Sequence, residues 1–191
     1  MGPSALSTEY GPVLLRLARE TARRWLGEKS DEAEGKPVVP GRFGGVFVTF
    51  WHGRTLRGCV GTFAPTTDLA RTVAEVTVAS LKDGRFAANP ITAGELAALK
   101  IEISILSDAV PTDDPLSLVP GRHGVIVRMG ARTGCFLPHV AVERGWSAEA
   151  FLANCCTMKA GLDADAWRSP DVEVLLFEAE VVAEGSEVDA P

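Results

Sequence analysis

The stretch Leu56-Arg57-Gly58-Cys59-Val60-Gly61-Thr62-Phe63 places a cysteine between glycines in a run that has the pattern of a β-strand. Side chains alternate between the two faces of a strand, so we expect Arg57 and Cys59 to share one face. A guanidinium beside a thiol favours the thiolate, which is the nucleophilic and metal-binding form of cysteine. Gly58 and Gly61 are expected to leave room for a ligand near the backbone. The stretch therefore predicts a strand with a chemical role.

The segments before this stretch predict a helix, a loop and a partner strand. A helix is expected from about residue 7 to Gly27, followed by a mobile loop over residues 28–44 that is charged and then rich in proline and glycine. Residues 46–51 read as a second strand, joined to residues 56–62 through His52-Gly53-Arg54. We therefore expect a hairpin that carries Cys59 on its second strand.

The segments after it predict alternating helices and hairpins. Helices are expected at residues 68–82, after a capping-box pattern of Thr92 and Glu95, and at 148–160 behind Ser147. Strands are expected at 101–107, 125–129, 133–137 and 172–182, with a long loop over 108–121. Because hairpins dominate and helices do not alternate strictly with strands, the fold class predicted is α+β with a mainly antiparallel sheet.

Eight segments carry a resemblance that covers about residues 10–182. In chain order they are 45–50, 56–62, 101–107, 121–127, 136–138, 145–146, and the pair 159–162 and 166–167. In this order they resemble the AMMECR domain family, whose signature contains a Leu-Arg-Gly-Cys-Ile-Gly-Thr core. Asp83-Gly84-Arg85-Phe86 also keeps the Asp, Arg and Phe of a family segment but lacks its neighbouring prolines. The resemblance implies an AMMECR-like fold in which helices flank the sheet and a larger and a smaller lobe enclose a cleft.

Composition favours one globular domain over residues 1–191, with a frayed tail at 184–191. The chain is 46% hydrophobic and 23% charged, its formal net charge is -6, and no stretch is long enough to span a membrane. The acidic balance disfavours nucleic-acid binding. The absence of a signal-like N-terminus and the cysteine spacing predict a cytoplasmic protein under reducing conditions.

The candidate site has two interpretations. In the first, Cys59 is a thiolate nucleophile and His123, in a glycine-flanked turn, is the acid or base. In the second, Arg57 and Arg122 bind an anionic ligand or peptide, and Glu102 orients one of them through an ion pair. Gly58, Gly61 and Thr62 complete the predicted ligand-binding set. Cys59 as a buried packing residue is the alternative to the first interpretation, and the second needs no catalytic cysteine.

No cofactor and no metal site is predicted. Cys135 and His139 are four residues apart and Cys155 and Cys156 are adjacent, which does not match structural zinc spacing. Glycine-rich segments such as 41–45 lack a nucleotide-binding fingerprint.

Three functions are therefore expected. One is a cysteine-dependent enzyme acting on a small molecule or a modified nucleotide, and another is a non-catalytic binding module. The third follows from the resemblance, which implies an accessory or pathway component that acts with a Memo-type protein and a radical-SAM enzyme.

Overall fold

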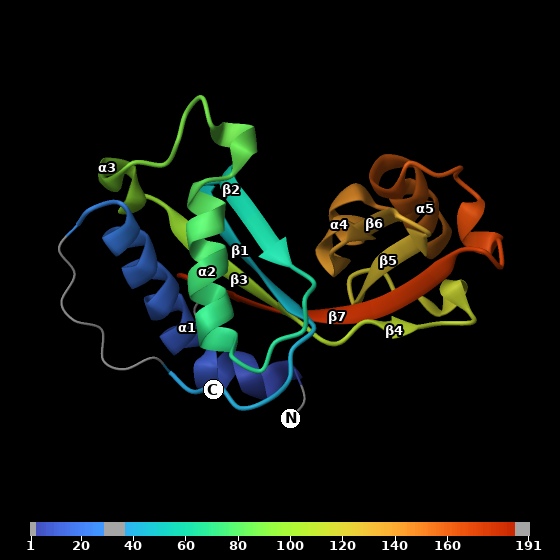
Figure 1. Cartoon of the computed structure of the whole chain (residues 1–191), viewed down its shortest axis with the longest axis horizontal. Helices are drawn as coiled ribbons and strands as arrows, with labels where there is room; N and C mark the ends of the chain where they lie inside the picture. The colour runs from blue at the N-terminus through green and yellow to red at the C-terminus, as the bar shows by residue number, and fades with distance from the viewer. Residues whose placement is uncertain (1–2, 29–36, 186–191) are drawn as a thin grey trace. The chain divides into compact units, whose positions relative to one another are not determined.

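The structure is a computed structural model that describes residues 3–28 and 37–185 (Figure 1). The chain divides into two compact units, a larger one of residues 1–106 and 180–191 and a smaller one of residues 107–179. Most of the predicted frayed tail and much of the predicted loop at 28–44 lie outside the described residues. The described end of that loop is packed, because Val39 and Phe43 belong to the hydrophobic core and Phe43 forms a bridge with Thr66.

Three helices belong to the larger unit: α1 (Pro3–Trp25), α2 (Leu69–Leu81) and the short α3 (Ala93–Leu96), with a 3₁₀ turn at Gly84–Phe86 before α3. α1 begins earlier than predicted and contains Pro12. α2 begins where the sequence predicts, because the Asp68 side chain accepts a hydrogen bond from the Arg71 amide. The buried faces of α1 and α2 share one core with the strands of this unit.

The sheet of the larger unit centres on β1 (Gly45–His52). β1 pairs antiparallel with β2 (Thr55–Thr62) on one side and with β3 (Lys100–Leu106) on the other. β2 is therefore the edge strand, and Val60, Val48 and Ile103 lie in one register row. The predicted hairpin and the predicted strand at 101–107 are confirmed within one or two residues.

The smaller unit combines short strands with short helices. Its elements are β4 (Val110–Pro111), β5 (His123–Met129), β6 (Arg132–Phe136), α4 (Pro138–Arg144), α5 (Ala148–Asn154), a π-helix at Cys155–Ala160, 3₁₀ turns at Pro115–Ser117 and Ala166–Arg168, and most of β7 (Glu173–Ala183). β5 pairs antiparallel with β6 and β7, and β4 pairs antiparallel with β7. The predicted β5–β6 hairpin is confirmed.

Two predictions for the smaller unit need correction. The segment 108–121 is not a plain loop, because it contains β4 and a 3₁₀ turn at Pro115–Ser117. The helix predicted over 148–160 changes from α to π at Cys155, although it is capped by Ser147 and ends at left-handed Gly161 as expected.

The α+β class with antiparallel strand pairing is confirmed. The cleft between lobes stays a prediction. No helix among the described residues is both long and apolar enough to cross a membrane.

Candidate functional site

Arg57 lies at a bulge in β2, and this changes its predicted surroundings. Gly58 pairs with Phe50 and Leu56 pairs with Trp51, so Arg57 between them has no counterpart on β1. A bulge redirects a side chain and breaks the simple alternation of faces. The Arg57 guanidinium contacts Glu95 and the Asn89 carbonyl rather than forming the pair with Cys59 that strict alternation predicts.

The contacts of Arg57 are those of a buried ion pair. Its Nε lies 2.5 Å and its Nη2 3.0 Å from the two Glu95 carboxylate oxygens, and the residue is only 8% exposed. The Arg57 hydrogen bond is the main cause that lowers the pKa of Glu95. The carboxylate that orients Arg57 is therefore Glu95, and the prediction of Glu102 for this role is wrong. A buried and neutralised guanidinium is poorly placed to bind an anion from solution.

Arg85 is the arginine beside Cys59. The Cys59 amide donates to Asp83 at 3.0 Å, the Cys59 carbonyl accepts from Arg85 Nη2 at 2.8 Å, and Thr49 Oγ1 donates to the sulfur at 3.3 Å. Asp83 caps the 3₁₀ turn at Gly84–Phe86 through the Arg85 amide, which fixes the position of the arginine. This turn therefore brings a carboxylate and a guanidinium to the thiol.

Asp83 and Arg85 form a tight pair whose two members differ in exposure. The Asp83 side chain is 6% exposed and the Arg85 side chain 59%. The Arg85 hydrogen bonds are the main cause that lowers the pKa of Asp83 to about 2, and the Cys59 and Arg85 amides add to this effect. The pKa of Arg85 is raised chiefly by Asp83 and further by Cys59. The local arrangement therefore holds a charged, accessible guanidinium beside the sulfur.

Asp83→Asn is expected to lower the free energy of unfolding at pH 7 by about 1–2 kcal/mol, less than the full linkage value because the partner Arg85 is exposed. The pKa of Asp83 falls from 3.8 to about 2 in the folded protein, so this stability is present above pH 4 and is lost as the pH falls towards 2. Urea denaturation of both proteins between pH 2 and 7 measures it. A difference that stays constant over this range would contradict the assignment.

The glycines of the signature do not leave space for a ligand, contrary to the prediction. An ideal Cβ on Gly58 would lie 2.3 Å from the Ser80 carbonyl oxygen in α2, and one on Gly61 would lie 2.2 Å from the Phe47 ring. Both positions are already filled by the protein itself. The glycines therefore serve close packing of the hairpin, while the backbone of Gly61 still borders a groove.

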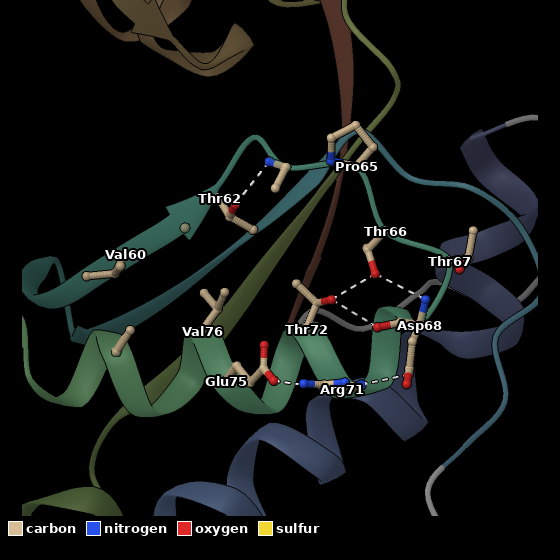
Figure 2. A pocket seen from close by; sticks show the side chains of 13 residues that line it. Val60, Thr62, Pro65, Thr66, Thr67, Asp68, Arg71, Thr72, Glu75 and Val76 are labelled. Carbon is tan, nitrogen blue, oxygen red and sulfur yellow. Dashed lines mark hydrogen bonds and ion pairs between the residues drawn. The ribbon is translucent and has the colours of Figure 1, made fainter.

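That groove lies between the end of β2 and α2 (Figure 2). It has a volume of about 550 Å³ and includes the predicted ligand-binding residue Thr62. The Thr62 hydroxyl accepts a hydrogen bond from the Ala64 amide, which holds the turn that follows β2. Of the predicted ligand-binding set, Gly61 and Thr62 border this groove and Gly58 does not.

His123 and Arg122 belong to the smaller unit, so a pairing of His123 with Cys59 stays a prediction. His123 Nδ1 accepts from the Val119 amide at 3.2 Å, which places the proton of the neutral ring on Nε2, 3.8 Å from Glu178. Arg122 pairs with Glu178 at 2.8 Å. A role of Glu102 towards Arg122 stays a prediction, because the two residues belong to different units.

The other cysteines have the environment of packing residues. Cys155 and Cys156 are fully buried, and burial raises the pKa of Cys155 to about 12 and raises the pKa of Cys135 strongly. Within residues 3–28 and 37–185, no group of three or more His, Cys, Asp or Glu side chains is placed to hold a metal ion. Cys59 differs from Cys155 and Cys156 in being partly exposed, and it has Arg85 beside it.

Comparison with known proteins decides the family. The AMMECR1 family model matches residues 15–182, most of the chain. The chain belongs to the AMMECR1 family. Among AMMECR1 relatives it is 40% identical to protein MK0488 of Methanopyrus kandleri, with 94% of this chain and 90% of that protein covered. A protein of Thermococcus gammatolerans is 35% identical, with 94% and 92% covered.

A solved structure of an AMMECR1 relative has the same fold. The crystal structure of the uncharacterized protein PH0010 from Pyrococcus horikoshii matches with a TM-score of 0.81 and 34% identity, covering 93% of this chain and 92% of that one. The match supports the mixed helix and antiparallel sheet architecture described above.

Sequence reasoning missed Asp83 and Arg85 as site residues of this AMMECR1 protein. The signal was available, because Asp83-Gly84-Arg85-Phe86 keeps three residues of a family segment. Nothing in its spacing from Cys59 indicates that the segment returns to the signature strand, since that contact depends on the length and docking of α2.

Proposed function

We propose that this AMMECR1 protein is a binding component that recognises the carboxylate or phosphate of a small ligand or peptide at Arg85, beside Cys59. One observation supports the proposal most directly: Arg85 is 59% exposed and is held by the buried Asp83 against the Cys59 backbone. Its Nε and Nη2 bond to Asp83 and to the Cys59 carbonyl, and its Nη1 takes no part in these bonds. A positioned guanidinium binds carboxylate and phosphate well.

We further propose that the protein acts as an accessory or pathway component with a Memo-type protein and a radical-SAM enzyme. This proposal rests on the AMMECR resemblance, and an exposed arginine at a fixed position suits contact with an acidic partner segment. Pull-down of the Memo-type protein with wild type and with Arg85→Glu tests both parts. If wild type and Arg85→Glu capture the Memo-type protein equally, the two proteins interact but Arg85 does not form the contact.

A second candidate function is a cysteine-dependent enzyme that uses Cys59 as thiolate and His123 as acid or base. The contact between Arg85 and Cys59 favours it, because positive charge beside a sulfur stabilises the thiolate. Cys59→Ser separates the two functions. A binding component keeps its affinity for the ligand, whereas an enzyme that forms a covalent intermediate loses turnover.

Arg85→Gln is expected to slow alkylation of Cys59 by iodoacetamide at pH 7.5 by about three- to tenfold, because the cation that favours the thiolate is removed. Mass spectrometry of the folded protein gives the rate. Arg71→Gln, which removes an exposed arginine of α2 whose ion-pair partner is Glu75, is the matched control and should leave the rate unchanged. Orthophosphate and small carboxylates are expected to protect Cys59 in the wild type only. Equal rates and no protection would contradict the proposed site.

A further inference from the structure

The free edge of β2 presents backbone groups that face away from β1. In an antiparallel ladder, residues alternate between pointing both backbone groups at the partner strand and pointing both away from it. The Cys59 amide and carbonyl bond to Asp83 and Arg85, which shows that Cys59 belongs to the outward set. Gly61, two residues later, therefore also points its N–H and C=O outwards.

Gly61 differs from Cys59 because its outward groups are not capped. In the part of the chain that the structure describes, no side chain or loop hydrogen-bonds the Gly61 N–H or C=O as Asp83 and Arg85 do for Cys59. An exposed edge with an open donor and acceptor is a template for an added strand. The N–H and C=O of Gly61 can therefore form backbone hydrogen bonds with an added peptide strand.

The groove shown in Figure 2 runs beside this open position. It closes at one end, where the Gly58 backbone meets the Ser80 carbonyl. The other end is bounded by the turn at Pro65–Asp68, where Thr66 Oγ1 bonds to the Asp68 amide and to the Thr72 hydroxyl. The result is a slot of about 550 Å³ along the last residues of β2.

The lining of the groove defines which peptide fits. Val60, Val76 and Ala79 provide an apolar floor for a side chain that enters between β2 and α2. The charged residues on the rim are Asp68, Glu75 and Arg71. The Arg71 guanidinium pairs with Glu75 at 2.8 Å, whereas Asp68 accepts only the Arg71 backbone amide. Two carboxylates therefore stand against one guanidinium, and the rim carries an excess of negative charge.

We propose that this edge and groove bind an extended, basic peptide segment of a partner protein by strand addition to β2 at Gly61. A β-branched side chain of the peptide enters between Val60 and Val76, and a lysine lies near Asp68 and Glu75. The occupant is a partner rather than a second copy, because the chain carries a formal net charge of -6 and would bring like charges together. The site depends on neither the Cys59 thiol nor the free part of Arg85.

The test titrates the full chain with a pool of acetylated and amidated pentapeptides, and follows the backbone amides and the valine methyl groups by two-dimensional NMR. Positions two and four of the peptides carry valine, isoleucine or threonine, and the other positions carry lysine. We expect a saturable shift of the Gly61 amide and of the Val60 and Val76 methyl groups. The same pool methylated at the central backbone nitrogen is expected to bind at least tenfold more weakly, since it cannot donate to the Gly61 carbonyl.

Two controls decide the outcome. Glu75→Lys changes an exposed residue and is expected to weaken binding of the lysine pool several-fold. A pool that carries aspartate in place of lysine should not bind the wild type. No saturable shift at Gly61, or equal binding of the methylated pool, would overturn strand addition. Equal affinity for the lysine and aspartate pools would overturn the choice of a basic partner.

Discussion

Replacing Glu95 with alanine is expected to lower the free energy of unfolding by about 3 kcal/mol, the largest effect of any single charge removal considered for this protein. Its carboxylate bonds to two nitrogens of Arg57, and Arg57 is only 8% exposed. Without Glu95 the guanidinium remains buried with a carbonyl and the nearby Phe86 ring as its neighbours. An uncompensated buried charge is costly, much more so than the loss of an exposed pair.

Urea denaturation at pH 7 measures this effect, and α2 offers a matched control. Arg71 and Glu75 form an ion pair at 2.8 Å in the same unit, but their side chains are 67% and 61% exposed. Glu75→Ala should therefore change stability by less than about 0.5 kcal/mol. The double replacement Arg57→Met with Glu95→Leu is expected to recover much of the loss, since it removes both charges. Equal losses for Glu95→Ala and Glu75→Ala would show that burial does not govern the Arg57 pair.

Gly58→Ala is expected to destabilise the larger unit by about 3 kcal/mol, although it adds a single methyl group. The methyl carbon would lie 2.3 Å from the Ser80 carbonyl oxygen, which is backbone and belongs to a helix packed in the core. A flexible side chain could move aside, but here α2 or the hairpin has to shift as a whole. The glycine before the cysteine is thus explained by helix docking and not by ligand access.

Thermal and urea unfolding of Gly58→Ala and Gly94→Ala gives the comparison. Gly94 lies inside α3, and nothing lies within 4 Å of the position where its Cβ would be built. Its replacement should be neutral or stabilise slightly, by up to about 1 kcal/mol from helix propensity. If both variants lost the same stability, the close approach of Gly58 to Ser80 would not be the cause.

Most helices and strands could be predicted from the sequence because periodicity and capping are signals that lie within a few residues. The β1–β2 hairpin, the Asp68 cap of α2 and the strand beginning near Ile101 all depend on periodicity and capping within a few residues. α4 was missed because it is a single short helix that begins directly at Pro138 after a strand. The π geometry at Cys155–Ala160 was also missed, since it has no distinct residue pattern.

The candidate site was harder to predict because tertiary contacts decide it. The alternation rule pairs Arg57 with Cys59, and one bulge residue removes that pairing. Arg85 reaches Cys59 across 26 positions of sequence, through a helix and a turn whose docking no local pattern specifies. An arginine does lie beside Cys59, but it is Arg85 and not the predicted Arg57.

The Ser80 side chain also determines which elements of the larger unit unfold together in solution. Its hydroxyl accepts from the Val60 amide at 3.0 Å and donates to the Val48 carbonyl at 2.8 Å, so a helix side chain bridges the β1–β2 ladder. Undocking of α2 would break both of these hydrogen bonds together with the packing of the helix on the hairpin. The hairpin that carries Cys59 and the helix that follows it are therefore one cooperative unit of local unfolding, and the half-buried thiol becomes fully exposed only when that whole unit opens.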